Sequence, residues 1–136
     1  MNLAERLKAV PLFANLSRKQ VNKLIDVGWI GTFKEGKVLC AEGRGGDDFF
    51  VILEGEAQAT RGGRKIRTLT QGDYFGEIAL LDNAHRTATV TALGPLVCFM
   101  LARNDFKIAL YTEDIAVKLL GTMASRLRAA EKLSAD

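Results

Sequence analysis

The spacing of apolar residues predicts helices at the two ends of the chain and strands between them. Apolar residues at positions 3, 4, 7 and 10, and again at 21, 24 and 25, recur at helical intervals, so both segments predict short helices. Pro11 ends the first helix. Ser17, with Gln20 three residues later, resembles a capping box that begins the second. Residues 1–28 are therefore expected to be helical.

Between residues 29 and 102, short apolar runs alternate with glycine-containing turns. These runs are rich in β-branched and aromatic residues: WIGTF, KVLCA, FFVIL, EAQAT, KIRTL, TATVTA and LVCFML. Turn signals about every 8 to 12 residues favour a sandwich or a barrel, and RGGR between two runs predicts a hairpin. We expect about eight strands folded as a jelly-roll β-barrel. GEIALL, at 76–81, lacks the alternation of a strand and predicts one or two helical turns.

The chain becomes helical again at residues 103–136. NDFKIAL predicts a short helix, and Thr112 is a suitable N-cap for a longer one. The longer helix has one apolar stripe: Ala116, Leu119, Leu120, Met123, Leu127 and Ala130. That stripe would pack on the core or form a dimer seam. No linker separates the three zones, so a single domain over residues 1–136 is predicted.

Composition limits the class of protein. With 48% hydrophobic and 26% charged residues, the 136-residue chain can form one core, and its net charge of +3 does not require a nucleic-acid partner. The longest apolar run, 93–102, is too short to span a bilayer and contains Gly-Pro. The first ten residues carry charges where a signal peptide needs an apolar segment. Cys40 and Cys98, far apart in apolar runs, predict buried thiols in a reducing compartment, so a cytoplasmic location is expected.

Candidate chemistry lies in FGEIALLDNAHRTATV, residues 75–90. Strand alternation after Arg86 places Ala88, Val90 and Ala92 on the same face as the arginine, and that apolar face should point inward. An unpaired buried charge is costly. Arg86 therefore needs a partner, which is either a carboxylate of the protein or a bound anion.

The residues before this arginine suit an anion. A helix that begins at Gly76 and Glu77 exposes backbone N–H groups, and glycine permits a close approach. Arginine makes bidentate contacts with phosphate oxygens. If Arg86 and the helix start converge, they frame one phosphate-sized hole. Glu77 would repel the phosphate directly, so it is better placed accepting from a neighbouring sugar hydroxyl, and a phosphate beside a sugar is a nucleotide.

These residues resemble a known family. FGEIALLDNAHRTATV is similar to the phosphate-binding cassette of the cyclic nucleotide-binding domain family, the type found in catabolite activators and kinase regulatory subunits. Further segments carry the resemblance along nearly the whole chain: PLFANLS, EGRGGDDFFVILEGE, LTQGDYFGE and ARNDF. The resemblance implies an eight-stranded jelly roll flanked by helices that binds cAMP or cGMP.

The resemblance also implies roles for individual residues. Arg86 would hold the exocyclic phosphate oxygens, and Glu77 would accept from the ribose 2′-hydroxyl. Backbone N–H groups would complete a cradle over cassette residues 75–88, and other residues would form the pocket wall and a lid. The cradle is Gly76, Ile78, Ala79, Thr87 and Ala88, the wall is Phe75 and Leu69, and the lid is Arg126 and Leu127.

Three positions leave alternatives open. An Arg86–Glu77 ion pair would satisfy both charges without any ligand. His85 stands where many family members have proline, which bears on the rigidity of the turn. Thr87 can assist guanine binding in the family, yet many cAMP binders also have a threonine or serine there. As the ligand of this chain we slightly favour cAMP over cGMP.

The expected function is a sensor that is not an enzyme. No nucleophile stands with a base, no GxSxG occurs, and a single histidine argues against a metal site, so neither a catalytic residue nor a cofactor is expected. Binding would be relayed by movement of the C-terminal helix, which offers a surface to a homodimer or an effector. One alternative is a degenerate member that acts as a protein-interaction module. The other is the ligand-sensing part of a larger regulator or channel, and this chain itself shows no DNA-reading motif.

Overall fold

The computed structural model describes residues 2–44, 48–76, 86 and 88–102, and, further along, residues 104–105, 117–118, 120–122, 124–126 and 128–129. The N-terminal part is helical, as predicted: α1 (Leu3–Lys8), the 3-10 turn η1 (Pro11–Phe13) and α2 (Arg18–Val27). The capping box is present, because the Ser17 hydroxyl accepts from the Gln20 N–H at 3.1 Å and the Gln20 side chain accepts from the Ser17 N–H at 2.8 Å.

Within the described residues, eight strands follow, all paired antiparallel. Their bounds are β1 (Trp29–Phe33), β2 (Val38–Cys40), β3 (Asp48–Glu54), β4 (Ala57–Arg61), β5 (Arg64–Leu69), β6 (Tyr74–Phe75), β7 (Thr89–Ala92) and β8 (Leu96–Ala102). They form two four-stranded sheets, in the orders β1-β8-β3-β6 and β2-β7-β4-β5. The mainly β class is confirmed. The described strands form these two sheets and not one closed barrel.

Two buried clusters hold the layers together. The first lies between the N-terminal helices and one face of β3 and β8, where Phe13, Phe49 and Phe99 are buried. The second lies between the two sheets, where Phe50 and Ile52 of β3 meet residues of β4, β5 and β7. β3 is therefore covered on both faces, which explains why DFFVILE shows no polar alternation.

The predicted hairpin is confirmed. β4 and β5 are joined at Gly62 and Gly63, whose φ angles of 58° and 77° lie in the region that glycine adopts without steric cost. The predicted helical turn at 76–81 falls, apart from Gly76, outside the described residues.

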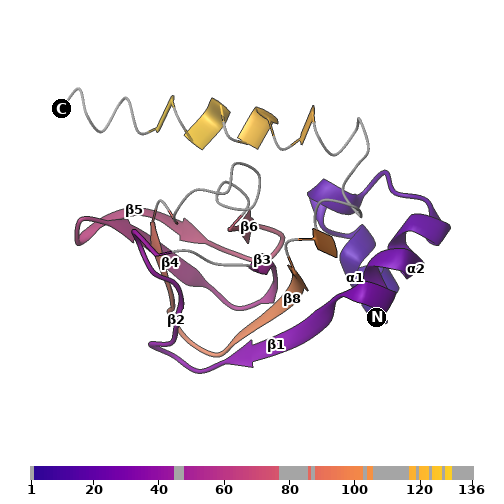
Figure 1. Ribbon diagram of the computed structural model, residues 1–136, viewed down its shortest axis with the longest axis horizontal. Coiled ribbons are helices and arrows are strands. Elements are labelled where there is room, and N and C mark those ends of the chain that lie inside the picture. The colour runs from indigo at the N-terminus through magenta and orange to yellow at the C-terminus, as the bar shows by residue number, and fades with distance from the viewer. Residues whose placement is uncertain are drawn as a thin grey trace.

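The described residues between 117 and 129 are helical, and Figure 1 shows them crossing above β5 and β6 toward the N-terminal helices. Leu120 is 64% exposed, so this member of the predicted apolar stripe does not pack on the core. Lys118, Thr122 and Arg126, spaced four apart on one face, are half-buried instead. The other members of the stripe, and Thr112, lie outside the described residues. No helix in the described part of the chain is long and apolar enough to cross a membrane.

Candidate functional site

Arg86 is the buried charged residue at the centre of the site. The residue is 7% exposed, so it lies inward, as predicted. Nη1 donates to the Gly76 carbonyl at 2.8 Å, and Nη2 donates to the Asp48 carbonyl at 2.7 Å. The guanidinium therefore joins the end of β6 to the start of β3.

The main chain of Arg86 is held as firmly as its side chain. Its N–H donates to the Arg44 carbonyl at 2.8 Å, and its carbonyl accepts from the Gly43 N–H at 2.9 Å. Strand β7 begins beyond it, with Val90 and Ala92 buried and the threonines between them half-buried. The predicted alternation is confirmed from Thr89 to Ala92, whereas Ala88 is half-buried like Thr89, and Thr87 lies outside the described residues.

The electrostatic environment of Arg86 leaves room for an anion. Both observed partners of the guanidinium are neutral carbonyls, and a guanidinium has five N–H donors. Within the described ranges, no carboxylate lies at ion-pair distance from Arg86; the salt bridge found there joins Arg6 to Glu54 at 2.8 Å. Because a buried cation without a counter-ion is costly, this guanidinium is suited to binding an anion.

Gly76 is required beside the guanidinium for two reasons. Its φ is 91°, in the region that favours glycine. A Cβ at this position would also lie 2.6 Å from Arg86 Nη1 and 2.8 Å from the Asp48 carbonyl oxygen. Any side chain here would displace the arginine or the start of β3.

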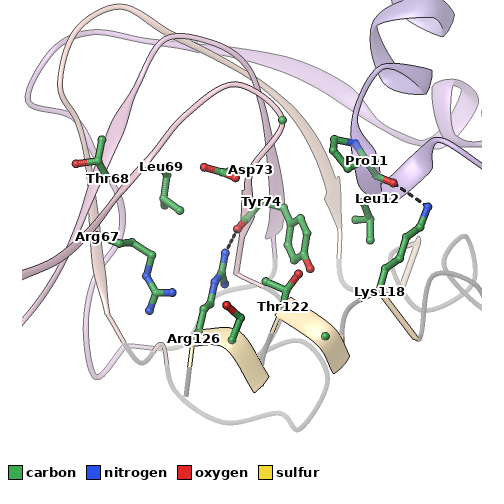
Figure 2. Close-up of a pocket in the computed structure, with 13 residues that line it drawn as sticks. Pro11, Leu12, Arg67, Thr68, Leu69, Asp73, Tyr74, Lys118, Thr122 and Arg126 are labelled. Carbon is green, nitrogen blue, oxygen red and sulfur yellow. Dashed lines mark hydrogen bonds between the residues drawn. The ribbon is translucent and has the colours of Figure 1, made fainter. Parts of the chain in front are cut away.

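A cavity of about 550 Å³ lies between η1, β5, the turn before β6 and the C-terminal helix (Figure 2). Pro11, Leu12 and Leu69 supply apolar wall, and Arg67 and Asp73 bring opposite charges to the lining. The size and mixed lining fit a small molecule that has both apolar and polar groups.

The C-terminal helix is fixed over this cavity at two points, both visible in Figure 2. Lys118 Nζ donates to the Pro11 carbonyl at 2.8 Å. Arg126 Nη2 donates to the Tyr74 carbonyl at 2.7 Å, and its guanidinium carbon lies 5.4 Å from the centroid of the Tyr74 ring. The helix therefore covers the cavity with cationic side chains bound to backbone oxygens.

The predicted site residues are distributed as follows. Gly76 and Arg86 are in contact, Ala88 is half-buried just before β7, and Leu69 and Arg126 line the cavity. Phe75 lies in the core, stacked on Phe50 with ring centroids 4.6 Å apart, and is not among the described cavity-lining residues. Five of the residues lie outside the described ranges: Glu77, Ile78, Ala79, Thr87 and Leu127.

Sequence reasoning missed two basic residues of the cavity. Arg67 stands two positions before Leu69 on β5, and strand alternation from Leu69 would have placed it on the same face. Lys118 stands eight positions before Arg126, a spacing that keeps both on one helix face. The bond from Lys118 to Pro11 has no signal in the sequence.

The two cysteines are buried thiols. Burial between the sheets raises the pKa of Cys98 from 9.0 to about 12, and the nearby Cys40 adds to the effect. Because the thiolate is the reactive form, Cys98 is inert at neutral pH. The described residues include no cluster of His, Cys, Asp or Glu that could hold a metal ion.

Comparison with known proteins gives a consistent result. The family model for the cyclic nucleotide-binding domain matches residues 30–112. A regulatory subunit of cAMP-dependent protein kinase from Yarrowia lipolytica is 36% identical over 124 residues, which cover 90% of this chain and 30% of that protein. The cGMP-dependent protein kinase isozyme 1 of Drosophila melanogaster is 38% identical over 114 residues, which cover 78% of this chain and 15% of that protein. The chain thus spans less than a third of the length of either relative.

A solved structure described as cAMP-bound PfPKA-R superposes with a TM-score of 0.91 at 30% sequence identity. The match covers 97% of this chain and 46% of that one. The likeness therefore extends over the N-terminal helices, both sheets and the C-terminal segment.

Proposed function

Because the chain belongs to the cyclic nucleotide-binding domain family, we propose that it is a sensor domain that binds a cyclic nucleotide and catalyses no reaction. The observation that carries the proposal is the buried guanidinium of Arg86, whose described partners are neutral carbonyls. A cyclic phosphate supplies a negative charge, which neither of the described partners of the guanidinium provides.

The phosphate cradle consists of Arg86 and backbone N–H groups of the cassette. Gly76 keeps space open beside the guanidinium, and Ala88 stands where the chain enters β7. Ile78, Ala79 and Thr87 supply further N–H groups. These roles, and that of Glu77 as acceptor of the ribose 2′-hydroxyl, rest on the likeness to the family. The ion pair between Arg86 and Glu77 remains the ligand-free alternative, and it involves a residue outside the described ranges.

The base occupies the cavity beneath the C-terminal helix, and Leu69 forms part of its wall. Arg126 and Leu127 close the lid, and the helix relays binding to a homodimer partner or an effector protein. Two bonds already fix this helix to Pro11 and Tyr74, so a ligand that binds the closed form more tightly shifts the population toward it. The names of the two relatives make a protein kinase the first effector to test. Residues 1–136 act as a single domain, and the buried thiols support a cytoplasmic location.

The proposed ligand is cAMP, and cGMP is the second candidate. Arg67, which lines the cavity, favours cGMP. Guanine offers the acceptors O6 and N7, to which arginine binds in a bidentate manner, whereas adenine presents an amino donor in place of O6. If cGMP is the ligand, Arg67→Gln will weaken cGMP binding about tenfold while cAMP binding changes little. Arg64→Gln, on an exposed residue of the same strand, is the control.

Thermal melts test the proposal. The parent protein and Arg86→Ala are heated with cAMP, with cGMP and with adenosine, which lacks the phosphate. A ligand at a hundredfold its Kd should stabilise the parent by about 2.7 kcal/mol. Adenosine should give no shift, and the shift of Arg86→Ala should be much smaller than that of the parent. An unshifted parent would favour the degenerate interaction module, and an equal shift in Arg86→Ala would remove the arginine from the site.

A further inference from the structure

A turn at residues 41–44 supports the main chain of Arg86 from both sides. The Arg86 N–H donates to the Arg44 carbonyl at 2.8 Å, and the Gly43 N–H donates to the Arg86 carbonyl at 2.9 Å. The turn itself is closed by the Arg44 N–H, which donates to the Ala41 carbonyl at 3.1 Å, and Gly43 has a φ of 79°. The place of Arg86 in the site therefore depends on where this turn lies.

Two hydrogen bonds to side chains fix the turn, and both involve Glu42. Its N–H donates to Thr89 Oγ1 at 3.0 Å, and its Oε1 accepts from the Gly62 N–H at 2.9 Å. The first bond ties the turn to the first residue of β7, and the second ties it to the end of the β4–β5 hairpin. Thr89 and Glu42 thus support the residues that hold Arg86.

The Thr89 hydroxyl does what a main-chain carbonyl does elsewhere between these strands. β2 and β7 pair as far as Cys40 opposite Val90. Beyond this pair, the Glu42 N–H meets the hydroxyl of a side chain. Valine forms strands as readily as threonine and has nearly the same shape. The strand alone therefore does not require a threonine at this position, whereas the bond to the turn does.

We infer that Thr89 and Glu42 are positioning residues, which hold the 41–44 turn where it places Arg86 for an anionic ligand. The inference rests on the proposed function and adds to it two residues that act through the main chain of the arginine. A binding group has to be held within about 0.5 Å of its productive place by the hydrogen bonds that support it. Because a bond transmits no more than its own free energy, the loss of either should weaken binding by about two- to tenfold.

Calorimetric titration with cAMP and with cGMP tests Thr89 through three variants. Thr89→Val removes the hydroxyl and should weaken binding of the nucleotide that the parent binds by about two- to tenfold. Thr89→Ser keeps a hydroxyl and should bind like the parent. Thr91→Val makes the same exchange two residues further along the same face of β7, and it should also bind like the parent.

Glu42 is tested by a pair of variants that leave β7 unchanged. Glu42→Ala and Glu42→Gln both remove the negative charge, but only glutamine keeps an oxygen that can accept from the Gly62 N–H. Any effect of the charge on an anionic ligand is therefore the same in both. Glu42→Ala should bind about two- to tenfold more weakly than Glu42→Gln.

Affinity separates this role from a general effect on the fold. A variant that is only less stable keeps the dissociation constant of the parent while it melts at a lower temperature, because nearly all molecules remain folded at ordinary temperatures. Equal dissociation constants for Thr89→Val and Thr91→Val would therefore overturn the role of Thr89, and equal constants for Glu42→Ala and Glu42→Gln would overturn that of Glu42. A parent that binds neither nucleotide would refute the proposed function and the inference together, whereas equal binding by the parent and every variant would refute the inference alone.

Discussion

Gly76→Ala is the substitution whose effect follows most directly from the geometry of the site. The backbone at this residue has a φ of 91°, which an alanine adopts only with strain. The new methyl group would lie 2.6 Å from Arg86 Nη1, where the guanidinium now donates to the Gly76 carbonyl. Alanine therefore strains the backbone and also pushes the arginine out of its bonded position.

The expected cost has two parts. Left-handed backbone costs a residue with a Cβ about 1–2 kcal/mol. Losing a hydrogen bond from a charged donor costs about 1.5–3 kcal/mol more. Gly36→Ala isolates the first part, because Gly36 has a φ of 85° and a Cβ there would meet nothing within 4 Å. Gly76→Ala should therefore destabilise by about 2.5–5 kcal/mol and Gly36→Ala by about 1–2 kcal/mol.

Urea denaturation measures both stabilities, and calorimetric titration with a cyclic nucleotide measures binding. Gly36→Ala should keep the affinity of the parent, whereas Gly76→Ala should lose measurable binding because Arg86 has moved. Equal stabilities for the two variants, with the affinity of the parent retained in both, would refute this account of the packing around Arg86.

Two further predictions concern the lid and the core. Lys118→Met removes the hydrogen bond to the Pro11 carbonyl, and such a bond contributes about 0.5–1.5 kcal/mol. The nucleotide dissociation rate, measured by stopped-flow displacement, should therefore rise about two- to tenfold. Arg128→Met, on an exposed residue of the same helix, should leave the rate unchanged, and equal rates for both variants would contradict the role of Lys118. The pKa of Cys98 is about 12 in the fold against 9.0 for an ordinary cysteine, so above pH 9 the unfolded chain loses a proton that the folded chain keeps, and stability falls. Between about pH 8 and pH 10, the parent should lose on the order of 1 kcal/mol relative to Cys98→Ala in urea denaturation, and parallel pH dependence of the two proteins would show that the thiol ionises freely in the fold.

Features that depend on a few neighbouring residues could be predicted from the sequence. The capping box at Ser17 and the hairpin at Gly62–Gly63 each need only a short motif, and both form as expected. Arg86 is buried, as strand alternation predicted, although β7 begins only at Thr89. Mainly β architecture follows because several such signals recur along the chain.

Features set by distant partners could not be read in the same way. β6 has two residues, too few to show alternation, and the split into two sheets depends on pairings between strands far apart in sequence. The partners of the Arg86 side chain are backbone carbonyls, which every residue has and which leave no signal. The sequence predicted that the apolar stripe of the C-terminal helix packs on the core or forms a dimer seam. In the structure Leu120, a member of that stripe, is exposed, and Lys118 faces the cavity. That helix covers a cavity of mixed apolar and polar lining and its cationic side chains bind backbone oxygens there, so the apolar stripe alone did not reveal which face points inward.

Calorimetric titration of the parent and of Arg86→Met with cAMP and cGMP tests whether the buried guanidinium binds the nucleotide. Methionine keeps much of the apolar length of the side chain and removes the charge that the phosphate needs. The parent should bind at least one cyclic nucleotide saturably. Arg86→Met should lose about thirtyfold or more in affinity, because removing one partner of a buried charge pair costs at least about 2 kcal/mol. Equal dissociation constants for parent and variant would contradict this role of Arg86.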